Sequence, residues 1–138
     1  PITRTFESKK QKGAEVDLST VFANSVKKAV RTVILDQKDH LEVIDRLETR
    51  DKEATVSWIM VTPAEAKITG KNRIELTKDG QRMLLTADTG TEVEMKIWSN
   101  VPPHEYDFRN PGTIRVGFET VIPANRASQL KVRLIPLK

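Results

Sequence analysis

Residues 113–122 read TIRVGFETVI, and their apolar side chains recur at every second position. Successive side chains of a β-strand point to opposite faces of a sheet, so Ile114, Val116 and Phe118 share one face and mostly polar residues take the other. The segment 129–137, QLKVRLIPL, alternates in the same way. Each segment therefore predicts a strand of an antiparallel sheet with one buried and one solvated face.

The same period of two recurs from Ala29 to the end of the chain. Turn-forming residues separate the alternating segments: Asp79-Gly80 favours a hairpin, and Asn110-Pro111-Gly112 favours a chain reversal. The segments predict strands at 29–35, 40–49, 54–62, 66–69, 73–77, 81–87, 91–99, 113–122 and 129–137. About nine strands with little helix indicate a sandwich or a barrel, and we expect an all-β fold, an antiparallel β-sandwich.

The length of 138 residues predicts one domain. The polar residues 1–13 are expected to form an N-terminal arm, and residues 14–138 the β-sandwich domain. Asp17 or Ser19 is suited to cap a short helical turn ahead of the first predicted strand. Pro1 stands where a starting methionine would be, so we expect the chain to be a piece of a longer protein.

The chain carries 23 basic and 19 acidic residues, a net charge of +4. Much of the excess lies in Arg4, Lys9, Lys10 and Lys12, which favours an exposed tail over a basic binding stripe for a polyanion. Nucleic acid is not an expected partner, because 5% aromatic residues provide few rings for stacking on bases. No apolar run reaches the ~18 residues of a membrane span, so no membrane association is expected either.

Catalytic and metal-binding motifs are scarce in this sequence. With no cysteine, thiol catalysis, thiolate metal sites and disulfides are excluded. His40 and His104 lie far apart in sequence and outside any metal-binding motif, and the chain has no phosphate-binding glycine loop and no nucleophile elbow. Considered from its residues alone, the chain is a non-catalytic β domain.

Two residues depart from the alternation of their strands. Asp45 lies on the apolar side of its strand, where an ionised carboxylate is costly unless it is paired. We favour a carboxylate satisfied by Arg31, Arg46 or a backbone N–H over a catalytic acid or base. Trp98 lies on a polar face, where its indole either packs under the next loop or stacks on a sugar ring; we favour packing.

The segment 104–113, HEYDFRNPGT, is a polar loop flanked by proline. It brings together His104, Glu105, Asp107 and the single tyrosine, Tyr106. These groups have the chemistry of an acid–base cluster, but an exposed polar loop anchored by Tyr106 is the simpler interpretation.

Three parts of the chain together carry a family resemblance. They are AEVDLS at 14–19 with VRTV at 30–33 and LEVIDR at 41–46; WIMVTPA at 58–64; and the run from Tyr106-Asp107 through NPGT at 110–113 to LKVRLIP at 130–136. In this order they resemble the carboxy-terminal β-sandwich region of heparinase II/III-type polysaccharide lyases, over about nine-tenths of the chain.

The resemblance implies a parent enzyme that cleaves uronic-acid-containing polysaccharides, such as glycosaminoglycans, by β-elimination. The catalytic Asn, His and Tyr of such lyases, and their metal-binding His/Asp set, belong to a preceding α-toroid and the first sandwich strands. Neither motif is in this chain, so the resemblance implies no catalytic or metal-binding residue here, and any divalent metal would belong to the missing part. It also implies a periplasmic or secreted location.

On this interpretation the chain supports the catalytic domain, and its partners are the α-toroid, the amino-terminal sandwich strands and an acidic polysaccharide. Candidate substrate-binding residues are Trp98, His104, Tyr106 and Arg109. The alternative is an independent carbohydrate-binding or adhesion module that recognises glycans without a lyase partner.

Overall fold

The computed structural model describes all 138 residues, and its regular elements are eleven β-strands. In chain order they are β1 (Ile2–Glu7), β2 (Gln11–Asp17), β3 (Val26–Asp36), β4 (Leu41–Thr49), β5 (Ala54–Thr62), β6 (Glu65–Gly70), β7 (Arg73–Lys78), β8 (Gln81–Asp88), β9 (Val93–Ser99), β10 (Ile114–Ile122) and β11 (Ala127–Leu137). The all-β prediction is confirmed, and the nine expected strands correspond to β3–β11. The structure has no helix that is long and apolar enough to cross a bilayer.

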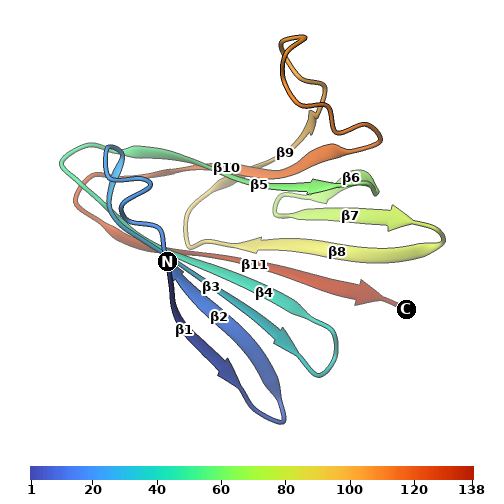
Figure 1. Ribbon diagram of the computed structural model, residues 1–138, viewed down its shortest axis with the longest axis horizontal. Coiled ribbons are helices and arrows are strands. Elements are labelled where there is room, and N and C mark those ends of the chain that lie inside the picture. The colour runs from blue at the N-terminus through green and yellow to red at the C-terminus, as the bar shows by residue number, and fades with distance from the viewer.

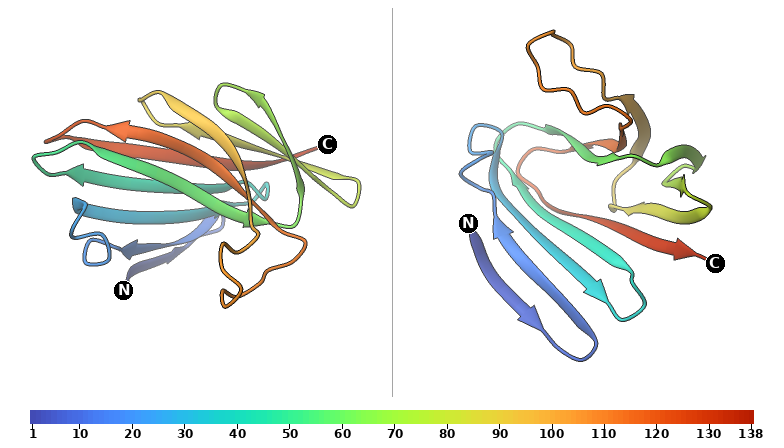
Figure 2. Two further views of the ribbon diagram at one scale, coloured as in Figure 1. Left: turned by 90° about the horizontal axis from the view of Figure 1, so that it is seen from above. Right: turned by 45° about the vertical axis from the view of Figure 1, so that its right-hand side comes forward.

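The strands form two antiparallel sheets (Figure 1). The larger sheet has eight strands in the order β1-β2-β3-β4-β11-β8-β7-β6, and the smaller has three in the order β5-β10-β9. Figure 2 shows the smaller sheet facing only part of the larger one, with β1 and β2 extending beyond it. The edge of the larger sheet formed by β1 and β2 therefore has no second layer over it.

The hydrophobic core lies between the smaller sheet and the central strands of the larger one. Phe118 and Val116 of β10 are fully buried, and so are Leu130 and Val132 of β11 opposite them. These are the alternate positions that the sequence assigns to the apolar face. Trp58 of β5 stacks on Phe118 with ring centroids 6.0 Å apart and an interplanar angle of 2°.

Gly117 allows β10 and β5 to pair closely at the centre of the smaller sheet. It pairs with Ile59, and a Cβ atom at this position would overlap the carbonyl oxygen of Trp58. Any side chain would therefore push β10 away from β5 at the level of the Trp58–Phe118 stack.

The N-terminal residues differ from the sequence-based expectations. Most of segment 1–13, expected as an arm, forms β1 and the start of β2, and β2 pairs with β3. The helical turn expected after Asp17 is wrong: Leu18 and Phe22 each accept backbone hydrogen bonds of isolated turns. Leu18 donates its N–H to the carbonyl of Ala29, which holds the start of this segment against β3, and the chain enters β3 at Val26 without forming a helix.

Candidate functional site

The β9–β10 loop, residues 100–113, projects from one end of the smaller sheet (Figures 1 and 2). Its two ends are joined, because Asn100 Nδ2 donates to Thr113 Oγ1 at 2.6 Å and that hydroxyl donates to the Asn110 carbonyl at 2.7 Å. Gly112 has φ of 73°, as expected of the predicted Asn-Pro-Gly turn. A rigid sheet end thus presents a long loop with a fixed base.

The tip of the loop is ordered by contacts among its own side chains. The imidazole of His104 stacks on the ring of Tyr106, with centroids 5.0 Å apart and planes 8° from parallel. Asp107 Oδ2 accepts the backbone N–H of His104 at 3.3 Å, and Asp107 donates its own N–H to the His104 carbonyl at 3.2 Å. Tyr106 and Phe108 nevertheless point into solvent, with 84% and 94% of their surface exposed.

A hollow of about 430 Å³ lies within the loop. It is lined by Asn100, Val101, Pro102, Pro103, His104, Glu105, Arg109, Asn110, Pro111, Gly112 and Thr113. Arg109 makes neither an ion pair nor a side-chain hydrogen bond in the structure, so its guanidinium is free to bind a ligand. The lining is polar, and its turn residues fix the backbone shape.

Trp98 lies on the outer face of β9, two residues before the loop. It is half-buried, and its partner across the ladder is Arg115. The Arg115 guanidinium donates to the Ser99 carbonyl from Nε at 3.2 Å and from an η nitrogen at 3.0 Å. The structure thus gathers His104, Tyr106 and Arg109 in one loop and leaves Trp98 at its base.

Solved structures with the same arrangement of strands include heparinase III, with a TM-score of 0.75 and 12% identity over 99% of this chain. A second heparinase III structure, with methylated lysines, has a TM-score of 0.71 and 13% identity over 99% of the chain. A heparan sulfate lyase HepC mutant from Pedobacter heparinus has a TM-score of 0.67 and 16% identity over the whole chain. This chain has the fold of one region of heparinase III.

The match confirms the resemblance inferred from the sequence at the level of the fold. The chain spans about a fifth of the length of these structures, 21% of both heparinase III chains and 22% of the HepC chain. No protein-family model matches the sequence, and no curated protein matches it at a significant level.

Within this heparinase III-like fold, Asp45 is held by an ion pair on the inner face of the larger sheet. Arg31 Nε and an η nitrogen donate to the two carboxylate oxygens of Asp45 at 2.7 and 2.8 Å. The hydrogen bond to Asp45 raises the pKa of Arg31 above its ordinary value, and burial only partly opposes it. The favoured interpretation, a paired carboxylate, is confirmed.

The two histidines lie in different turns. His40 is in the β3–β4 turn, where its Nδ1 is 3.3 Å from Asp36 Oδ2. His104 is in the β9–β10 loop and contacts Tyr106. No group of three His, Asp or Glu side chains is arranged to hold a metal ion.

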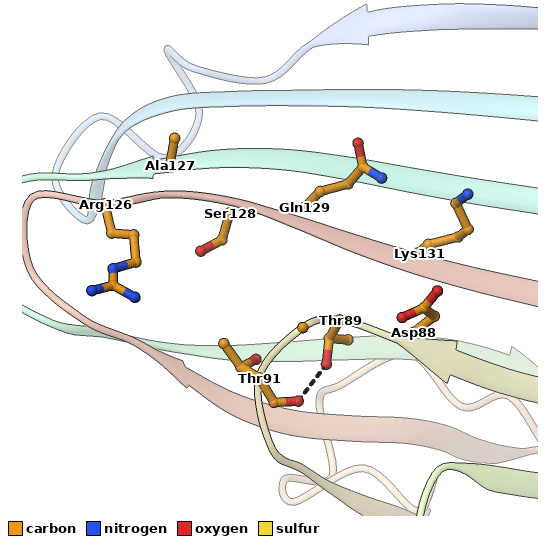
Figure 3. A pocket seen from close by; sticks show the side chains of 9 residues that line it. Asp88, Thr89, Thr91, Arg126, Ala127, Ser128, Gln129 and Lys131 are labelled. Atoms are coloured by element: carbon orange, nitrogen blue, oxygen red, sulfur yellow. Dashed lines mark hydrogen bonds between the residues drawn. The ribbon is translucent and has the colours of Figure 1, made fainter.

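A second polar hollow, of about 410 Å³, lies at the other end of β9, between the β8–β9 turn and the start of β11 (Figure 3). Arg126 and Ser128 line it from one side and Thr89 and Thr91 from the other, and Thr89 donates its hydroxyl to the Thr91 carbonyl at 2.6 Å. This hydrogen bond closes the β8–β9 turn, and none of the candidate residues predicted from the sequence lines the hollow.

Sequence reasoning missed Phe108 as a candidate. The available signal was an aromatic residue in a charged, proline-flanked loop, two positions after Tyr106. An exposed aromatic ring in such a loop indicates binding more strongly than a polar side chain would, because polar side chains are ordinary in loops.

Proposed function

We propose that this chain is the carboxy-terminal, non-catalytic β-sandwich domain of a heparinase II/III-like polysaccharide lyase. The observation that carries the proposal is the fold match, which includes 99–100% of this chain but only about a fifth of each heparinase III or heparan sulfate lyase chain. The parent enzyme would cleave uronic-acid-containing polysaccharides by β-elimination, and this domain would support its catalytic part.

The chemistry of β-elimination explains why a domain of this kind would act as a support. The reaction needs a base, a group that neutralises the uronate carboxylate and an acid, all within hydrogen-bond reach of one sugar. Displacement of such groups by about 1 Å lowers the rate strongly. A two-layered β structure with a close-packed apolar core is rigid enough to keep one wall of a cleft in place.

Three of the groups with acid–base chemistry in this chain have structural uses. Asp45 pairs with Arg31, Asp107 closes the tip of the β9–β10 loop, and His104 stacks on Tyr106. We therefore assign the catalytic groups, and any divalent metal, to the preceding α-toroid and the amino-terminal sandwich strands. Those segments and an acidic polysaccharide are the proposed partners, in the periplasm or outside the cell.

Lyase activity can be followed by the ultraviolet absorbance of the unsaturated uronide that β-elimination releases. We expect no release from heparan sulfate or alginate by the purified chain, and release when the same chain is expressed with the preceding segments of its open reading frame. Release by the 138-residue chain alone would refute its non-catalytic role.

An independent carbohydrate-binding module is the second candidate, favoured by the exposed rings of Tyr106 and Phe108. Deleting residues 1–138 from the longer protein separates the two functions. Loss of a support should abolish cleavage of short soluble oligosaccharides, whereas loss of a module should weaken only the binding of long polymers.

A further inference from the structure

The two most exposed large hydrophobic side chains of the molecule, Phe108 and Tyr106, lie in the β9–β10 loop two residues apart. Val101, the next most exposed, is in the same loop. Exposed aromatic surface is unfavourable in water, and its concentration on one projecting loop indicates a contact site.

The Tyr106 ring is oriented before any ligand arrives. His104 covers one of its faces in a parallel stack, and the tip is closed by the two hydrogen bonds between His104 and Asp107. One face of Tyr106 therefore remains available, and little further ordering is required for a flat ligand to pack on it.

The hollow within the loop is not lined by the Tyr106 and Phe108 rings themselves, but His104, on which Tyr106 stacks, and Arg109, next to Phe108 in the chain, both line it. Its composition is that of a site for a hydroxyl-rich ligand. Of its lining residues only Val101 has a large apolar side chain; the others are prolines, glycine and polar residues. An apolar protein segment would find few apolar partners there, since the centres of protein interfaces are depleted in polar and charged groups. A sugar ring has an apolar C–H face for an aromatic ring and hydroxyl groups for the polar lining.

The charges in the hollow distinguish an acidic sugar from a neutral one. Arg109 has no partner, and its planar guanidinium matches the two oxygens of a carboxylate or sulfate group. Glu105 lines the same hollow and would repel such a group. The site thus has one cation that attracts an acidic sugar and one anion that limits its affinity.

We propose that the β9–β10 loop is a subsite for one acidic sugar ring, which packs on Tyr106 and Phe108 while Arg109 binds its carboxylate or sulfate. This inference rests on the proposed function, because a polysaccharide lyase is the setting in which such a ring is supplied. It adds a substrate contact to a domain otherwise assigned to support.

Tyr106 is the only tyrosine of the chain, so tyrosine labelled with ¹³C gives a single set of ring signals that report on the loop. The probes are a heparan-type tetrasaccharide, an alginate tetrasaccharide that has carboxylates but no sulfate, and neutral cellotetraose. We expect saturable shifts of the Tyr106 signals with both acidic probes, at a Kd on the order of millimolar, and much weaker binding of cellotetraose. If only the heparan-type probe binds, sulfate rather than carboxylate is the group recognised.

Variants that keep Tyr106 as the reporter identify the contacts. Phe108→Ala and Arg109→Ala should each weaken binding of the acidic probes by about tenfold. Glu105→Gln should tighten it about threefold and leave cellotetraose unchanged. Phe22→Ala, which removes an exposed ring from the β2–β3 turn, is the matched control and should change nothing.

The proposal is overturned if Tyr106 does not respond to any acidic probe, if cellotetraose binds as tightly, or if Phe22→Ala weakens binding as much as Phe108→Ala. It is also overturned if the Tyr106 signals shift only on addition of the preceding lyase segments, because the loop would then be a protein contact. None of these results depends on lyase activity, so the proposed function can survive the loss of this subsite.

Discussion

At the centre of β10 the backbone of Gly117 passes so close to Trp58 that no side chain fits between the strands. The stack of Trp58 on Phe118 lies directly beside it and is part of the main core. A single residue without a side chain therefore permits the pairing of β5 and β10 on which the smaller sheet depends.

Gly117→Ala should destabilise the protein by about 2 kcal/mol, because the added methyl group must separate β10 from β5. Urea unfolding followed by tryptophan fluorescence measures the loss. Gly70→Ala is the matched control, since a Cβ there meets only the flexible guanidinium of Arg73. Equal stabilities of the two variants would show that the close approach at Gly117 carries no energetic weight.

The Arg31–Asp45 pair shows what the sequence reveals about an individual residue. The position of Asp45 on an apolar face predicted a hydrogen-bond or ion-pair partner for its carboxylate, and Arg31 was one of the partners expected from the sequence. The alternation of a strand fixes which face a side chain is on, but it does not fix which of several cations reaches it. That choice depends on the register of β3 and β4, which places Arg31 opposite Asp45.

Asp45→Ala should cost about 2 kcal/mol, less than for a fully buried pair because the Arg31 side chain is 39% exposed. The loss arises from a guanidinium left without its partner, so the double variant Arg31→Met/Asp45→Leu should recover most of the stability. A double variant as unstable as Asp45→Ala, measured by the urea midpoint, would contradict this explanation.

Acid should remove a small part of the stability through the Glu75–Arg82 pair on the outer face of the larger sheet. The hydrogen bond from Arg82, at 2.8 Å, lowers the pKa of Glu75 below its ordinary 4.5. Since the folded pKa lies below the unfolded one, this contribution is complete above pH 4.5 and is lost as the pH falls through the folded value. The urea midpoint of Glu75→Gln should therefore decline less on acidification than that of the wild type. An identical decline would be evidence against the pair.

Among the elements, hairpins joined by short turns were predictable from local chemistry. Asp79 and Gly80 both have positive φ, 51° and 75°, and they join Lys78 to Gln81 in a two-residue turn. The β9–β10 loop was likewise predictable from its Asn-Pro-Gly turn. The aromatic residues of the loop were visible in the sequence, but the degree to which Phe108 is exposed and the stacking of His104 on Tyr106 were not, because both depend on how the loop projects from the sheet.

The β1–β2 hairpin escaped sequence reasoning because its residues are mostly polar. Its apolar packing comes from one cross-strand pair: Phe6 of β1 lies opposite Gly13 of β2, and the Phe6 ring covers that glycine. The guanidinium carbon of Arg4, two residues earlier in β1, lies 5.3 Å from the centroid of the Phe6 ring. An aromatic ring over a glycine stabilises a sheet edge without giving a recognisable pattern in the sequence.

Phe6→Ala should loosen β1, because the hairpin then loses its main cross-strand contact. Amide hydrogen exchange in β1 and β2 should become faster while exchange in β10 stays unchanged. Thr5→Ala, a change on the opposite face of the same strand, is the control. Unchanged protection of β1 in Phe6→Ala would mean that backbone pairing alone holds the edge.

For the whole molecule, the distribution of strands between the two sheets was not predictable from the sequence. After β4 the chain leaves the larger sheet for β5, and β11 returns to lie between β4 and β8. Pairings of this kind join residues far apart in the chain, such as Thr49 and Arg126, 77 positions apart. Alternation identifies the strands and their buried faces, but strands with the same pattern are interchangeable until tertiary packing selects their partners.

The proposed role as a support makes a specific demand on the longer lyase that we propose. If the domain holds one side of the active-site cleft in place, weakening the core of the domain should lower the temperature at which polysaccharide cleavage is lost. The rate of cleavage at low temperature should stay unchanged.

The measurement is uronide release by the longer enzyme after heating, with Gly117→Ala compared against Gly70→Ala. We expect Gly117→Ala to lose half its activity several degrees lower than Gly70→Ala, with equal kcat in the cold. Equal inactivation temperatures, in spite of earlier unfolding of the Gly117→Ala domain, would contradict a supporting role.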